Sequence, residues 1–125
     1  GLLSSADLTQ AFRVRRKLSQ AVNNEVLGRY DAIITASALA PAYRFDSIDP
    51  ETPPGSPMQT MPFNLTGNPA MSIPTGLSSG GLPLSMQIVG RPFEDGMVLR
   101  IGQAYEHATQ FTASRPKLAT LAEAA

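Results

Sequence analysis

The feature that most constrains this 125-residue chain is the concentration of proline between Pro41 and Pro62, where six prolines fall. Because each proline removes a backbone donor and restricts the residue before it, no regular helix or central strand is expected there. A loop of this length is commonly a covering or binding loop, or else a disordered linker. The sequence therefore predicts a loop over 37–62, and we favour a functional covering loop over the linker.

Before this loop, the sequence predicts a long amphipathic helix over 4–28. Ser4 and Asp7 have the spacing of a capping box, which satisfies free backbone N–H groups at a helix start. Gly28 can end the helix, because glycine accepts the left-handed conformation common just past a C-terminus. The apolar residues recur mostly at fours and so fall near one stripe: Leu8, Phe12, Leu18, Val22 and Val26.

Short apolar runs predict the strands. The run 32–36 contains β-branched residues and is consistent with a strand buried on both faces. Two further runs, 69–74 and 83–90, are separated by a segment rich in serine and glycine, which favours a hairpin. Carboxylates at Glu94 and Asp95 suit the start of a second helix over 94–108. We therefore expect an α/β layer fold in a single segment, 1–114, followed by a tail over 115–125.

Composition excludes several classes of function. The 10 basic and 10 acidic residues balance, so the charge expected of a nucleic-acid binder is missing. The basic cluster of Arg13, Arg15, Arg16 and Lys17 is best interpreted as a solvated helix face. Without cysteine and with a single histidine, His107, we expect no metal site, no cofactor and no disulfide. No apolar run is long enough to span a bilayer, so we expect a soluble cytoplasmic protein with no membrane partner.

Two runs carry a resemblance to a known family. The segments 62–76 (PFNLTGNPAMSIPTG) and 80–93 (GGLPLSMQIVGRPF) closely resemble the C-terminal block of amidase-signature enzymes. The preceding helix, the buried strand after Tyr30 and Asp31, the proline-rich loop and the last helix also resemble the family, so the likeness covers about 4–109. It implies the C-terminal part of the mixed-sheet α/β/α fold of that family.

The resemblance also implies a function. Members of the family hydrolyse or transfer amide bonds with a serine nucleophile, a second serine in a cis peptide bond and a lysine, all upstream of this block. We therefore expect no catalytic residue in this chain. It would complete the sheet and one side of the substrate cleft of an amidase, with the upstream half of the enzyme as its partner and a small-molecule amide as the substrate. The start at Gly1 rather than at methionine is expected of a fragment, a processed product or an expression product with a trimmed tag.

The resemblance places substrate-binding positions at Met61, Phe63 and Asn64. Methionine and phenylalanine offer an adaptable apolar wall, and asparagine can orient a polar group by hydrogen bonding. Alternatively, Met61 and Phe63 simply join the core. Asn64, Gly67 and Pro69 could equally be structural, with Gly67 permitting a tight entry into the next strand.

One local match suggests the opposite conclusion. Ser78-Ser79-Gly80-Gly81 resembles the family string that holds two catalytic serines. We interpret it as a hairpin turn, because Leu77 stands where the family has glycine and neither Lys17 nor Lys117 is placed to act as a base. For His107 we favour a role at the helix end over catalysis.

The parent protein and its class remain open at this point. The segment 35–39 departs from the proline-containing run usual in the family, and the Asp-containing stretch typical of the tRNA-dependent amidotransferase subunit is missing, which favours a stand-alone amidase. The alternative is an independent, non-catalytic module that binds a ligand or forms a homodimer. A fragment would leave unpaired strand edges and apolar patches around 32–36 and 69–73, which invite oligomerisation, whereas a natural module would carry polar cover there.

Overall fold

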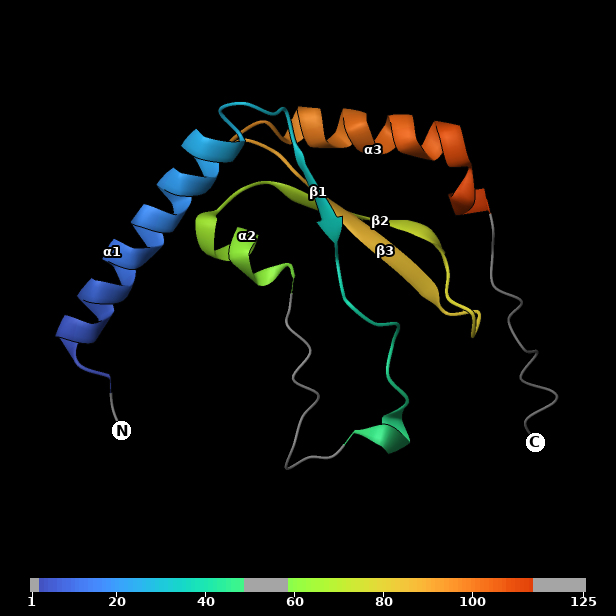
Figure 1. Ribbon diagram of the computed structural model, residues 1–125, viewed down its shortest axis with the longest axis horizontal. Coiled ribbons are helices and arrows are strands. Elements are labelled where there is room, and N and C mark those ends of the chain that lie inside the picture. The colour runs from blue at the N-terminus through green and yellow to red at the C-terminus, as the bar shows by residue number, and fades with distance from the viewer. Residues whose placement is uncertain (1–2, 49–58, 114–125) are drawn as a thin grey trace.

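A three-stranded antiparallel sheet with helices around it forms the described part of the chain (Figure 1). The computed structural model describes residues 3–48 and 59–113. Its main elements, in chain order, are α1 (Ser5–Ala21), β1 (Ile33–Ala36), α2 (Met61–Thr66), β2 (Ala70–Leu77), β3 (Pro83–Val89) and α3 (Asp95–Thr109). The α/β class, the long first helix and the C-terminal helix agree with the sequence-based expectation.

The start of α1 has the predicted capping box. The backbone N–H of Asp7 donates to the Ser4 hydroxyl at 3.2 Å, and the backbone N–H of Ser4 donates to the Asp7 carboxylate at 2.9 Å. The helix continues beyond Ala21 as a π-helical turn, Val22–Val26, and is capped at Leu27. A serine and an aspartate three residues apart thus satisfy free donors at both ends of the first turn.

The position after this helix requires glycine, Gly28, for a reason that differs from the prediction. It is not among the residues with positive φ, so the expectation of a left-handed glycine cap is wrong. A Cβ atom at Gly28 would lie only 2.5 Å from the carbonyl oxygen of Asn24. The widened π-helical turn brings that carbonyl close, and the lack of a side chain is what the position requires.

The predicted loop over 37–62 contains regular turns that the prolines did not exclude. A short 3₁₀ turn spans Phe45–Ser47, and α2 begins at Met61, with Pro62 in its first turn, where no backbone donor is needed. The prediction of an irregular segment up to 62 is therefore wrong at these two places. Gly67, with φ of 78°, ends α2 in the left-handed conformation. The residues 49–58 lie outside the described part of the chain.

The strand order is β1-β3-β2, and both neighbours of β3 run antiparallel to it. Strands β2 and β3 form the predicted hairpin, closed by a serine-glycine turn in which Gly81 has φ of 78°. An irregularity between Pro74 and Gly76 lets β2 continue to Leu77, beyond the predicted end at 74. Within the described residues, β1 and β2 each leave one edge without a strand neighbour.

Helix α3 packs on one face of the sheet, chiefly against β2 and β3 (Figure 1). The buried core there consists of Ile73, Ile88 and Val98, and partly buried neighbours complete it: Ala32, Met71, Met86, Ile101 and Tyr105. The prediction that β1 is buried on both faces is wrong, since Ile34 is 59% exposed. Ile34 pairs with Ile88, so it lies on the same face as α3 but beyond the strands that α3 chiefly covers.

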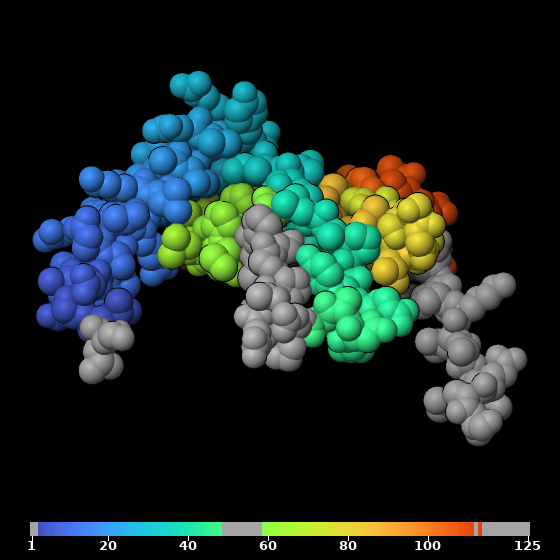
Figure 2. All heavy atoms as spheres, turned by 60° about the horizontal axis from the view of Figure 1, so that its bottom comes forward, coloured from blue at the N-terminus to red at the C-terminus, as the bar shows by residue number. Residues whose placement is uncertain are grey.

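Helix α1 extends away from the sheet and packs along α2 (Figure 2). None of its residues is buried, and Phe12, on the predicted apolar stripe, is 56% exposed. Leu8, Val14 and Leu18 are exposed as well. An amphipathic helix normally buries its apolar face, so this stripe is a surface without a partner among the described residues.

Candidate functional site

The three residues predicted to bind substrate all lie on α2. Met61 and Asn64 are three residues apart, which places them on the same side of the helix, and both are exposed, Met61 by 58%. Phe63 is half-buried and points to a different side of the helix. The structure thus brings Met61 and Asn64 together on one accessible surface, next to exposed Leu65, and separates Phe63 from them.

The start of α2 is held by a buried glutamine from the centre of the sheet. The side chain of Gln87 on β3 is only 2% exposed, and its Nε2 donates to the carbonyl oxygen of Gln59 at 2.7 Å. The same nitrogen lies 3.4 Å from the carbonyl oxygen of Ala36, the last residue of β1. We call these two hydrogen bonds the Gln87 bridge. It connects the end of β1 with the backbone just before α2.

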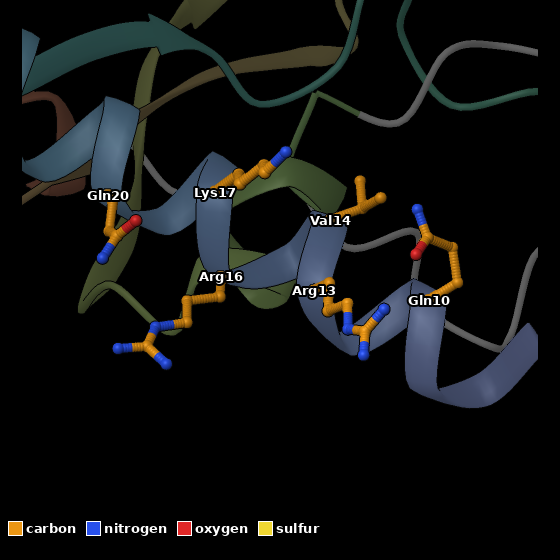
Figure 3. Close-up of a pocket in the computed structure, with 6 residues that line it drawn as sticks. All are labelled: Gln10, Arg13, Val14, Arg16, Lys17 and Gln20. Atoms are coloured by element: carbon orange, nitrogen blue, oxygen red, sulfur yellow. The ribbon is translucent and has the colours of Figure 1, made fainter. Parts of the chain in front are cut away.

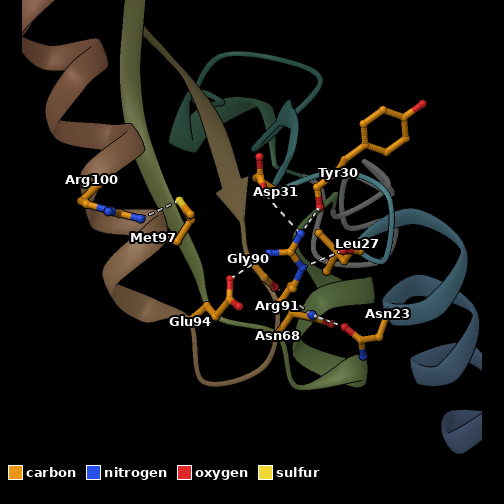
Figure 4. A network of polar contacts seen from close by, with 10 residues as sticks. All are labelled: Asn23, Leu27, Tyr30, Asp31, Asn68, Gly90, Arg91, Glu94, Met97 and Arg100. Atoms are coloured by element: carbon orange, nitrogen blue, oxygen red, sulfur yellow. Dashed lines mark hydrogen bonds and ion pairs between the residues drawn. The ribbon is translucent and has the colours of Figure 1, made fainter.

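The end of α2 is held by a buried asparagine. The Thr66 hydroxyl donates to Asn68 Oδ1 at 2.6 Å, and Asn68 Nδ2 donates to the carbonyl oxygen of Gly90 and to Asn23 Oδ1, both at 2.9 Å. Figure 4 shows Asn68 between Asn23 of the first helix and Gly90 beyond β3. A single carboxamide therefore satisfies groups from three parts of the chain, as a buried polar side chain must to offset its desolvation.

Two side chains of α1 contact the carbonyl end of α2. Arg15 Nε donates to the carbonyl oxygen of Leu65 at 2.7 Å, and the Ser19 hydroxyl donates to that of Thr66 at 3.2 Å. The last carbonyls of a helix lack partners within the helix and carry partial negative charge, so a guanidinium is favourable there. Of the basic cluster, which the sequence analysis interpreted as a solvated face, Arg15 thus has a structural contact.

Arg91 joins the turn before β1 to the start of α3. It donates to the carbonyl oxygen of Leu27 at 2.7 Å and to that of Tyr30 at 3.2 Å, and it forms ion pairs with Asp31 and Glu94, each at 3.2 Å (Figure 4). Its hydrogen bond to Asp31 is the largest cause of a raised pKa of Arg91, and the hydrogen bond to Glu94 acts in the same direction. The Glu94 carboxylate, predicted to sit at a helix start, is at that start and contacts Arg91.

Among residues 3–48 and 59–113, the other chemistry-bearing side chains do not converge on a site. The Ser78 hydroxyl accepts the backbone N–H of Leu82 at 3.1 Å within the hairpin turn, while exposed Ser79 lies at its tip. Lys17 lies on α1, and Lys117 lies outside the described residues. His107 is exposed in the last turn of α3, where the sequence analysis placed it.

The hollow on α1 is a helix surface and not a cleft. It is lined from one helix by Gln10, Arg13, Val14, Arg16, Lys17 and Gln20. Figure 3 shows their side chains spread along α1. This agrees with a solvated face for Arg13, Arg16 and Lys17. Between residues 3 and 113, apart from the gap at 49–58, no group of three or more histidine, cysteine, aspartate and glutamate side chains could hold a metal ion.

Sequence reasoning did not single out Gln87, Asn68 or Arg91. Gln87 and Asn68 are polar residues beside apolar strand positions, which is a signal for a buried hydrogen-bonding role. Apart from Thr66, which is two residues before Asn68, their partners lie 22 to 51 residues away along the chain, and no local pattern identifies these. Among the described helices, none is long and apolar enough to cross a membrane.

Comparison with known proteins identifies the family to which this chain is similar. The amidase family model matches residues 2–99. A glutamyl-tRNA(Gln) amidotransferase subunit from Thermotoga maritima is 44% identical over 102 residues, which cover 81% of this chain and 21% of that protein. The corresponding subunit from Halalkalibacterium halodurans is 38% identical over 111 residues, which cover 87% of this chain and 22% of that protein. The chain thus spans about a fifth of the length of these relatives.

Solved structures agree with the sequence comparison. The crystal structure of the Thermotoga maritima subunit superposes with a TM-score of 0.75 at 42% identity, covering 85% of this chain and 23% of the other. A bacterial aryl acylamidase of the amidase-signature family superposes with a TM-score of 0.71 at 24% identity, over 92% of this chain and 26% of the other, and so shares the fold. With a family match over most of its length and a common fold, this chain belongs to the amidase family.

Proposed function

We propose that this chain is the C-terminal portion of an enzyme that cleaves carboxylic amide C–N bonds, and that it supplies one wall of the acyl pocket without supplying a catalytic residue. The family match over residues 2–99 and the 44% identity to an amidotransferase subunit support the reaction class. In this proposal Met61 and Asn64 contact the substrate, with Phe63 supporting them from the half-buried side of α2. The upstream portion of the enzyme is the partner, and the location is cytoplasmic.

Amide cleavage requires groups that this chain does not bring together in its described residues. An amide carbonyl is a poor electrophile, so a serine must lose its proton to a positioned base as it attacks. Backbone N–H donors must also stabilise the oxyanion that forms. Ser78 is engaged in a hairpin turn, and the described lysine, Lys17, lies on α1. We therefore assign the serine nucleophile, the second serine and the lysine to the upstream portion.

The observation that carries this proposal is the uncovered apolar surface. The stripe of α1 containing Leu8 and Phe12 is exposed, and so is Ile34 on β1, next to a strand edge without a described neighbour. A chain that folds and acts alone would be expected to cover such surfaces with polar residues. An upstream portion that packs on α1 and β1 would cover both exposed surfaces. These surfaces therefore favour a portion of an amidase over an independent ligand-binding or dimerisation module.

A chimera tests this proposal. This chain would replace the matching residues of the Thermotoga maritima subunit, and hydrolysis of a panel of aliphatic and aromatic amides would be compared for the chimera and for the 125 residues alone. We expect hydrolysis only by the chimera. Hydrolysis by the 125 residues alone that is abolished by Ser79→Ala would contradict the proposal and return the hairpin serines to consideration as the nucleophile.

A second candidate is amide transfer within a tRNA-dependent amidotransferase. The relatives from Thermotoga maritima and Halalkalibacterium halodurans favour it, since both are glutamyl-tRNA(Gln) amidotransferase subunits, whereas the departures noted in the sequence favour a stand-alone amidase. Glutamine distinguishes the two. For this chain joined to its own upstream portion, a transferase predicts release of ammonia from glutamine and its passage to glutamyl-tRNA in the presence of the other subunits, while a stand-alone amidase predicts hydrolysis of other amides without them.

A further inference from the structure

We infer that Gln87 is a positioning residue for substrate binding in the acyl pocket, because it fixes the start of α2, an inference that rests on the proposed function of Met61 and Asn64. Gln87 lies in the middle of β3, between Thr35 on β1 and Ser72 on β2, on the sheet face opposite α3. It does not reach the exposed surface of α2 itself. Its effect must pass through the backbone that it holds.

The geometry of the Gln87 bridge points to this role. Its shorter hydrogen bond, 2.7 Å long, ends on the carbonyl oxygen of Gln59, two residues before Met61. The longer bond ends on Ala36, so the same nitrogen connects the start of α2 to the sheet. Since Gln87 is almost fully buried, loss of its amide removes two hydrogen bonds from a buried site, where a hydrogen bond costs more to lose than at the surface.

The two ends of α2 are held independently. Asn68, Arg15 and Ser19 bind groups at its C-terminal end, whereas Gln87 binds the backbone before its N-terminal end. The helix has only six residues, so its own hydrogen bonds cannot orient it firmly. Loss of the Gln87 bridge should therefore release the Met61 end of α2 and leave its far end in place.

This arrangement predicts a kinetic effect that differs from that of a purely structural residue. A pocket wall contacts the acyl group equally in the ground state and the transition state, so displacing it raises KM and leaves kcat unchanged. A residue that only stabilises the fold would instead lower the active fraction, which reduces the apparent kcat at constant KM.

The test uses the chimera that hydrolyses amides, with Gln87→Met to remove both donors at similar size. We expect KM for the preferred amide to rise about tenfold, as for one lost buried hydrogen bond, with kcat within about twofold. Thr35→Val is the matched control, because Thr35 is the half-buried neighbour of Gln87 in the strand register and takes no part in the bridge. In combination with Met61→Ala, the effect of Gln87→Met should be less than additive.

A second measurement reports on α2 without catalysis. The chain contains no cysteine, so Met61→Cys introduces a thiol on α2 that is unique within this chain and can be alkylated. We expect the preferred amide to slow this alkylation, and the protection to be lost on Gln87→Met but kept on Thr35→Val.

Three outcomes would overturn the inference. These are an unchanged KM, a fall in kcat at constant KM, and protection of the thiol that survives Gln87→Met. In each case the proposed function would stand as long as the parent chimera hydrolyses amides. A parent chimera that hydrolyses no amide would remove both the proposed function and the inference.

Discussion

Gly90 illustrates how much a single residue can matter where elements meet. A Cβ atom there would lie 2.7 Å from Cγ2 of Val98 and 3.5 Å from the carbonyl oxygen of Glu94. The Gly90 carbonyl oxygen also accepts a hydrogen bond from the Asn68 carboxamide, and its backbone N–H donates to the carbonyl oxygen of Pro69 at 2.9 Å. The close approach of α3 to the end of β3 therefore depends on the absence of a side chain.

We predict that Gly90→Ala lowers the free energy of unfolding by about 1–3 kcal/mol, because Val98 must move out of the core to make room. Urea unfolding followed by circular dichroism measures this. Gly96→Ala is the control, since Gly96 lies on α3 with nothing within 4 Å of an added Cβ and alanine favours a helix. Equal midpoints for Gly90→Ala and the unmodified chain would contradict the predicted contact.

The capping box at Ser4 predicts a shifted titration of Asp7. The Ser4 hydroxyl is the largest cause of a lowered pKa of Asp7, and the Ser4 backbone N–H acts in the same direction. The folded-state pKa lies below its ordinary value, so the stabilisation is fully present above about pH 4 and is lost as the pH falls through the lowered pKa. We expect an NMR titration to place the pKa of Asp7 below 3.8 and Ser4→Ala to move it upward.

Ser5→Ala is the control for this titration, because Ser5 lies beside the capping box without taking part in it. A pKa of Asp7 that does not respond to Ser4→Ala would show that the hydroxyl bond is not formed in solution.

For individual residues, the sequence predicts the contacts between residues that are close together along the chain. Ser4 and Asp7 are three residues apart, and their pairing follows from that spacing. The need for glycine at Gly28 arises from a π-helical turn whose Asn24 carbonyl approaches it, which the residue pattern does not indicate. The partners of Gln87 lie 28 and 51 residues away, so its role depends on tertiary structure.

Among the elements, the formation of α1 could be predicted from the sequence, but the exposure of its apolar side chains could not. Its periodicity predicts a long amphipathic helix, and the structure contains one. The pattern cannot tell what covers the apolar stripe, and in this chain Leu8 and Phe12 are exposed. Helix α2 was missed because it has only six residues and contains a proline, although proline is well tolerated in the first turn.

Because the apolar stripe of α1 is exposed, substitutions in it should affect binding to an upstream portion much more than the stability of this chain. Phe12→Ala should change the free energy of unfolding of this chain by less than about 0.5 kcal/mol, as for surface substitutions. It should weaken binding to a separately expressed upstream portion by about tenfold or more, since a large aromatic residue at an interface centre is often a main contributor. Isothermal titration calorimetry measures the affinity.

Lys17→Ala, on the basic side of α1, serves as the comparison and should leave that affinity within about twofold, because charged residues at an interface rim contribute little. Equal affinities for Phe12→Ala and the unmodified chain would exclude the apolar stripe as the contact surface.

For the molecule as a whole, Ile73, Ile88 and Val98 form the core under α3, and Val89 and Leu27 are fully buried outside that cluster, while α1 and Ile34 of β1 are exposed. The fold class and the order of most elements could be predicted from sequence, because apolar periodicity and turn residues are local. The sequence did not predict which strand is covered: β1 was expected to be buried on both faces, but Ile34 is exposed. For the candidate site, the resemblance named the residues of α2, while the packing that orients them became visible only in three dimensions.

The most direct test of the central claim is to find where the nucleophile lies. The chimera would be treated with a serine-reactive phosphonate, digested and analysed by mass spectrometry, with a matched sample pretreated with excess amide substrate. We predict a single substrate-protected adduct on a serine outside this chain and no protected adduct on Ser78 or Ser79. A substrate-protected adduct on either of these two serines would contradict the account.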